Sequence, residues 1–119
     1  MNTIIIKELF STALSEANGI ILRQRIEEII PNLKEDDFIY IDFQDIRLYA
    51  SPFFNACISY LVEKYTPNFV EKKLKLNNMT DLGQKTYDRS YNNALRDYLN
   101  DKKNDEVIDK IIQKNIQDS

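Results

Sequence analysis

The hydroxyl of Ser51 is the side chain best placed for chemistry in this sequence. It follows a run of β-branched and aromatic residues, 38–43, that ends at Asp42 and Phe43. A serine followed by a proline, here Pro52, is typical of a helix start: the serine oxygen caps a free amide, and proline needs no donor there. The sequence therefore predicts Ser51 as the N-cap of a helix just beyond a strand. Free amides at such a position favour a phosphate or another negative group.

The run before the serine predicts a central strand. Two sets of side chains alternate along it: Ile39, Ile41 and Phe43 on one face, and Phe38, Tyr40 and Asp42 on the other. Both faces are largely apolar, which is typical of a strand covered on both sides. Beyond Ser51, apolar residues recur at helical spacing until Pro67, and this pattern predicts a helix. These residues are Phe54, Cys57, Ile58, Leu61 and Tyr65.

The remaining chain alternates between strand and helix patterns. In order, we predict strand 3–7, loop 11–19, helix 20–30, the central strand, the helix after Ser51, edge strand 73–77, helix 80–98, polar break 100–104 and helix 107–116. The order βαβαβαα predicts an α/β fold, a small mixed sheet with helices packed on it. We expect one domain over residues 1–100. Residues 101–119 would form an amphipathic helix that packs on this domain or on a partner.

Composition limits the class of protein. With 119 residues, 43% hydrophobic and 29% charged, the chain is expected to form one globular domain. A net charge of −3 and a pI near 5.0 argue against a nucleic-acid partner. No apolar run approaches the roughly 20 residues that span a membrane. The N-terminus lacks a secretory layout, so we expect a cytoplasmic protein with no membrane partner.

The sequence lacks residues that several kinds of catalytic or binding site require. The chain has no histidine and only two glycines, which excludes an imidazole base and a glycine-rich phosphate loop. Asp42 could accept amide hydrogen bonds from the turn that follows it. Together with Asp45 it could hold a hard cation or serve a small hydrolase, but the spaced oxygen ligands of a calcium site and a catalytic base are missing. We therefore expect no catalytic residue, no metal and no cofactor, and we expect Cys57 to lie in the core.

The run IDFQDIRLYASPFFNACISYL resembles the STAS fold, named after sulfate transporters and anti-sigma factor antagonists. It is most similar to the STAS-like family of unknown function. The core of that family is a strand ending in Asp-Phe, followed by Ser-Phe-x-Asn/Asp-Glu at a helix start. Those places are taken here by Asp42, Phe43, Ser51, Pro52, Phe53, Phe54 and Asn55. The resemblance extends over residues 20–99.

The resemblance implies a mechanism. In anti-sigma factor antagonists of bacterial signalling, a serine at this helix start is phosphorylated by an ATP-using serine kinase, and the phosphate blocks docking onto that kinase. Ser51 would be that serine, and the partner would be a histidine-kinase-like ATPase or serine kinase. We expect a regulatory protein-interaction module whose surface centres on Ser51, Asn55, Ser59 and loop 44–50. The alternative is an accessory domain that forms a homo-oligomer through its C-terminal helix, without a phosphate switch.

Overall fold

Strand β2 (Ile39–Asp42) lies at the centre of a three-stranded sheet, between β1 (Thr3–Ile5) and β3 (Leu74–Asn77). The computed structural model describes the backbone of residues 2–117 and the side chains of residues 2–102. Over this part the sheet is wholly parallel, so the expected mixed sheet is wrong. Helical crossovers link the strands and return the chain to the same end of the sheet. The predicted α/β class, the central position of β2 and the edge position of β3 are confirmed.

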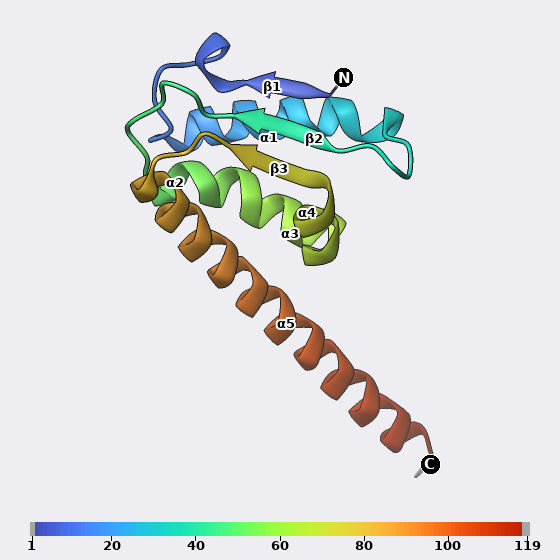
Figure 1. Ribbon diagram of the computed structural model, residues 1–119. Coiled ribbons are helices and arrows are strands. Elements are labelled where there is room, and N and C mark those ends of the chain that lie inside the picture. The colour runs from blue at the N-terminus through green and yellow to red at the C-terminus, as the bar shows by residue number, and fades with distance from the viewer. Residues whose placement is uncertain (1, 118–119) are drawn as a thin grey trace.

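Over residues 2–117, five α-helices and three further helical turns connect or follow the strands. They are η1 (Ile6–Glu8), α1 (Glu16–Ile29), η2 (Ile30–Asn32), α2 (Ser51–Phe54), the π-helical turn η3 (Asn55–Ser59), α3 (Tyr60–Tyr65), α4 (Pro67–Lys73) and α5 (Asp81–Gln117). The segments α2, η3 and α3 follow one another without a gap, and we call them together helix 51–65. The α1 helix and helix 51–65 lie side by side behind the sheet (Figure 1).

Among the residues that the structure describes, helices cover only one face of the sheet. Ile39, Ile41 and Phe43 are completely buried beneath the helices, whereas Tyr40 on the other face is 40% exposed. The predicted coverage on both faces is therefore wrong. Two crossovers of the same hand, between strands that follow in sequence order, place all of the crossover helices on one face. Tyr40 tolerates the open face because its ring carries a polar hydroxyl.

Two helix boundaries differ from prediction. The expected loop over 11–19 gives way to helix at Glu16, because the Ser15 hydroxyl accepts a hydrogen bond from the Asn18 amide at 3.1 Å. Pro67 does end the preceding helix, but it also begins α4. Thr66 stands between the two with φ of 93° and caps α4 through the Phe69 amide at 3.3 Å.

The long helix α5 runs from Asp81 to Gln117 without interruption. The predicted cap at Thr80 is confirmed, because its hydroxyl accepts a hydrogen bond from the Gly83 amide at 3.1 Å. The predicted polar break at 100–104 is wrong: its Asn and Asp residues lower helix propensity only modestly, its Lys residues favour a helix, and none breaks a helix as proline does. Figure 1 shows the C-terminal part of α5 extending beyond the sheet and its helices. The isoleucine stripe predicted over 107–116 lies outside the described side chains, and the division at residue 100 stays a prediction.

None of the helices, over the part of the chain that the structure describes, combines the length and the apolar character that crossing a membrane requires.

Candidate functional site at the carboxyl edge of the sheet

Asp42 joins the carboxyl ends of two strands. One oxygen of its carboxylate accepts hydrogen bonds from the Gln44 amide and from the Asn78 side chain, both at 2.9 Å. The bond from Asn78, followed by that from Gln44, lowers the pKa of Asp42 below its ordinary value. The expectation that Asp42 accepts an amide bond from the next turn is confirmed, and the side chain holds the end of β2 against the end of β3.

Asp45 has a different partner from Asp42. Its carboxylate pairs with Lys7 at 3.2 Å, and both side chains are exposed, so the pair contributes little stability. Its backbone has φ of 68°, the left-handed conformation that aspartate tolerates better than most residues. Within residues 2–102 no three His, Cys, Asp or Glu side chains gather as a metal ion would require.

Ser51 is the first residue of its helix rather than the N-cap. The N-cap is Ala50, whose backbone is extended and whose carbonyl accepts a hydrogen bond from the Phe53 amide at 3.2 Å. The chain enters the helix from a backbone bridge in which the Ala50 amide donates to the Ala13 carbonyl at 2.9 Å, and this fixes where the helix begins. The predicted cap is therefore wrong by one residue. Ser51 remains half-buried at a helix start, followed by Pro52 as predicted.

The π-helical turn aligns one side of helix 51–65 with the core. Buried residues recur at intervals of four, at Phe53, Cys57 and Leu61, and each is followed by a second buried residue. A regular α-helix would rotate such a row by about 40° per interval, because it has 3.6 residues per turn. The wider turn over Asn55–Ser59 offsets this rotation. Cys57 lies in the core as predicted, and burial raises the pKa of its thiol far above the ordinary value.

The same spacing places Asn55 and Ser59 toward α5. The Asn55 side-chain oxygen accepts a hydrogen bond at 2.6 Å from Ser90, a residue only 1% exposed. Ser59 lines a small cavity of about 100 Å³ between helix 51–65 and α5. The three residues predicted to share one partner-facing surface are therefore separated: Ser51 lies at the carboxyl edge of the sheet, whereas the other two contact or face α5.

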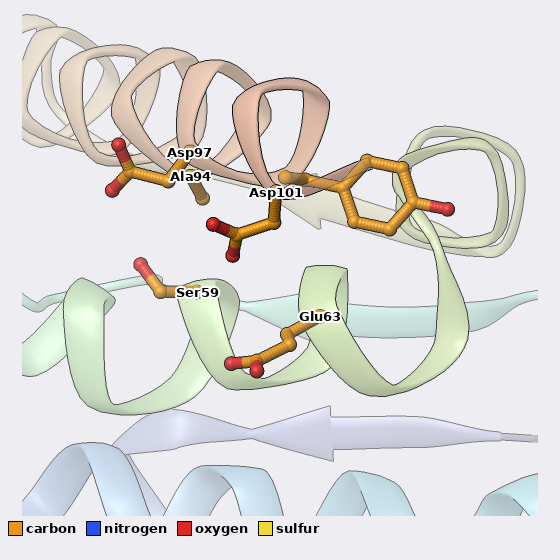
Figure 2. A pocket seen from close by; sticks show the side chains of 6 residues that line it. Ser59, Glu63, Ala94, Asp97 and Asp101 are labelled. Atoms are coloured by element: carbon orange, nitrogen blue, oxygen red, sulfur yellow. The ribbon is translucent and has the colours of Figure 1, made fainter. Parts of the chain in front are cut away.

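The cavity beside Ser59 is acidic. Figure 2 shows Glu63 beside Ser59 on one helix, with Asp97 and Asp101 opposite on α5. These residues carry like charges across a helix–helix seam, and this arrangement weakens packing there. Sequence spacing alone gave no sign of this cavity, because its two walls are more than thirty residues apart in the chain.

Exposed leucines surround the segment before Ser51, and sequence analysis did not single them out. We call Leu14, Leu48 and Leu82, which are 38%, 55% and 58% exposed, the leucine surface. Tyr49 connects them. It forms a bridge with Ala13 beside Leu14, it follows Leu48, and its ring lies against Gly83 beside Leu82. Gly83 was the residue in the sequence that could have indicated this packing, since a glycine in the first turn of a helix often marks the close approach of another side chain.

Tyr49 holds this loop rigidly. Its hydroxyl donates a hydrogen bond to the Ile46 carbonyl at 2.7 Å, and its ring stacks on Phe54 with centroids 6.2 Å apart. Only 7% of Tyr49 is exposed, so the side chain that anchors this loop belongs to the core. The leucine surface is therefore presented on a fixed backbone.

A second polar network fastens helix 51–65 to α1. The Glu27 carboxylate accepts hydrogen bonds from Lys64 at 2.7 Å and from the Tyr65 hydroxyl at 2.9 Å, and Arg23 approaches it at 3.5 Å. The hydrogen bond from Lys64 is the main cause that lowers the pKa of Glu27. Arg23 also lies over the ring of Tyr60, 4.1 Å from its centroid. This network keeps the helix that begins at Ser51 in place.

Comparison with known proteins agrees with the resemblance seen in the sequence. A family model described as a STAS-like domain of unknown function matches residues 18–84, a span that includes most of α1, the sheet strands β2 and β3 and helix 51–65. No curated protein and no solved structure matches the chain.

Proposed function

The chain belongs to the STAS-like domain family of unknown function, and from that premise we propose that it acts as a non-catalytic, cytoplasmic protein-interaction module in a regulatory pathway. The observation that supports this most is the leucine surface at the carboxyl edge of the sheet, beside Ser51. Its three leucines are 38% to 58% exposed to water. Each is next in sequence to Tyr49 or to a residue that lies against it, and we propose that they gather into one apolar patch of the kind that marks an interaction site.

The position of this surface supports the proposal. In this parallel sheet the loops that follow β1, β2 and β3 all begin at the carboxyl edge, and loops held by a rigid scaffold often carry binding residues. Asp42 and Asn78 fix the ends of β2 and β3 at this edge, and Tyr49 fixes the loop between β2 and helix 51–65. A partner would meet a rigid platform and would lose little binding free energy to ordering it.

We propose that the partner is a histidine-kinase-like ATPase or serine kinase and that Ser51 carries the switch. Ser51 starts helix 51–65 next to Leu48 and Tyr49, so a phosphate there would lie at the rim of the leucine surface. It would add a charge of about −1.5 to −2 where helix amides favour an anion and where an apolar contact disfavours one. Phosphorylation would then reduce docking without unfolding the helix.

Two substitutions of Ser51 test the switch. Affinity capture from lysate of the native host, followed by mass spectrometry, identifies the partner ATPase, and phosphosite mapping of the chain from the same host reports on Ser51. Ser51→Asp should weaken binding of that ATPase, whereas Ser51→Ala should bind as the phosphate-free parent does. Absence of phosphate at Ser51 in the presence of the partner, with equal binding by both variants, would remove the switch from the proposal.

The alternative function, self-association through the C-terminal helix, has one observation in its favour. Helix α5 is continuous and extends beyond the rest of the molecule (Figure 1), so residues 107–116 are carried on a rigid arm. Isolated helical segments of this length are marginal in water, and pairing would stabilise the arm. Ile112→Asp should halve the mass in solution if this arm makes an oligomer, and it should leave the mass unchanged if the arm does not.

A further inference from the structure

The two edges of the sheet differ in how well they are protected against pairing with another strand. The β3 edge carries Lys75 within the strand and Lys73 just before it, and such charges prevent another strand from pairing. The β1 edge, Thr3–Ile5, has three β-branched residues with neither a charge nor a proline. Among the described residues β1 pairs with β2 alone, so its outer edge is free. An unprotected edge of high β propensity is suited to receive another strand.

A groove runs along this free edge. It has a volume of about 490 Å³ and lies between β1 and the C-terminal half of α1. The residues of β1 form one wall, Leu9 and Ile29 add apolar lining, and Glu8, Arg25 and Glu28 line it with charged side chains. Grooves of this kind, with a strand edge on one side and a helix on the other, accept an extended chain by strand addition.

The outward backbone groups of β1 face this groove. The Asn2 carbonyl accepts a hydrogen bond from the Tyr40 amide of β2 at 2.7 Å. Successive residues of a strand in a parallel ladder point their backbone groups to opposite sides, so the amides and carbonyls of Thr3 and Ile5 point away from β2. An added strand would find two donors there, the Thr3 and Ile5 amides, and one acceptor, the Thr3 carbonyl, because the Ile5 carbonyl already accepts the first hydrogen bond of η1 as its N-cap.

We propose that the added strand is β1 of a second copy of this chain, paired antiparallel across a two-fold axis. The charges that line the groove favour this occupant. Glu8 follows the carboxyl end of β1, whereas Arg25 lies on the part of α1 that returns toward the amino ends of the strands. Antiparallel pairing brings these opposite ends together, so that Glu8 of each copy would face Arg25 of the other at both ends of the interface. Arg25 approaches Glu28 of its own copy at 3.7 Å, but both side chains are exposed and such a pair is weak, so Arg25 can also pair with the second copy.

The architecture favours this pairing as well. Two copies would make a continuous six-stranded sheet, a common size, whereas a sheet of three strands is small. A two-fold interface uses the same surface on both subunits, as an identical pair of edge strands provides. Helix α5 follows β3, the strand at the opposite edge of the sheet, so it does not obstruct the β1 edge (Figure 1).

The test measures the mass of the full chain by analytical ultracentrifugation over a wide range of concentrations. Ile5→Lys places a lysine on the β1 edge, and Asn77→Lys places the same lysine on the β3 edge. The two positions form a matched pair, because Ile5 and Asn77 flank Asp42 in one row of the sheet. We expect the parent and Asn77→Lys to reach twice the chain mass of 14.0 kDa. Ile5→Lys should raise the dissociation constant of the dimer by about tenfold or more.

Hydrogen exchange provides the second measurement. The amides of Thr3 and Ile5 should become protected as concentration rises in the parent and not in Ile5→Lys. A parent that stays monomeric at every concentration would overturn the proposal. So would a dimer that survives Ile5→Lys, or one that Asn77→Lys dissociates equally. A dimer lost with Ile112→Asp but kept with Ile5→Lys would assign the contact to the C-terminal helix instead.

Discussion

Gly19→Ala should destabilise the chain, although helix propensity alone predicts the opposite. Gly19 lies inside α1, where alanine is favoured over glycine by about 1 kcal/mol. A Cβ atom at this position would lie 2.3 Å from the carbonyl oxygen of Phe53 and 2.9 Å from the Cβ of Ala56. The first of these neighbours is backbone, so relief requires α1 and helix 51–65 to move apart rather than one side chain to rotate.

The cost of overpacking exceeds the gain in helix propensity, so the predicted change in stability is a loss. Overpacking of this kind costs about 1–3 kcal/mol, and contact with backbone belongs at the upper end, so we expect a net loss of about 2 kcal/mol. For a chain of this length that loss lowers the melting temperature by roughly 6–10 °C. Urea unfolding gives the free energy, with Gln24→Ala on the exposed side of α1 as control, expected to change stability by less than about 0.5 kcal/mol. A Gly19→Ala variant more stable than the parent would refute the close approach of the two helices.

Three further substitutions test the site by urea unfolding. Ser51→Ala should change stability by less than about 0.5 kcal/mol, because Ala50 is the N-cap; a loss near 2 kcal/mol would restore Ser51 as the cap. Asp42→Ala should lose about 1 kcal/mol or more through its bonds to Gln44 and Asn78, and an unchanged stability would contradict that role. Glu27→Gln should lose about 1 kcal/mol at neutral pH. Because the pKa of Glu27 is lowered in the fold, its contribution is present above the ordinary value of 4.5 and disappears as the pH falls through the lower folded value. A deficit that persists in acid would argue against the ionised carboxylate as its source.

The order of strands and helices could be predicted because hydrophobic periodicity reflects local burial. The pattern of Phe38–Phe43 correctly located β2, and Thr80 correctly located the start of α5. The same pattern could not show that one face of β2 is open, because tyrosine is compatible with burial and with exposure. Tyr40 therefore appeared to be a core residue until the helices were seen to lie on one face.

The site depends on contacts that periodicity does not report. Ser51 was correctly placed beyond the central strand, but the bridge between Ala13 and Tyr49, which sets the helix start, joins segments 36 residues apart in the sequence. The exposure of Leu48 and Leu82 likewise depends on how Tyr49 packs against Gly83. Long-range packing of this kind decides which leucines are buried, and a single sequence does not contain it in readable form.

The central claim is that a partner docks on the leucine surface, and the most direct test is a binding titration of the captured partner with two matched variants. Leu48→Asp puts a charge into the surface, and Ile21→Asp puts the same charge on an exposed apolar residue of α1, 42% exposed, outside it. We predict that Leu48→Asp raises the dissociation constant by at least about tenfold, as expected for a central apolar contact, and that Ile21→Asp leaves it unchanged. Equal binding by Leu48→Asp and the parent would contradict the account.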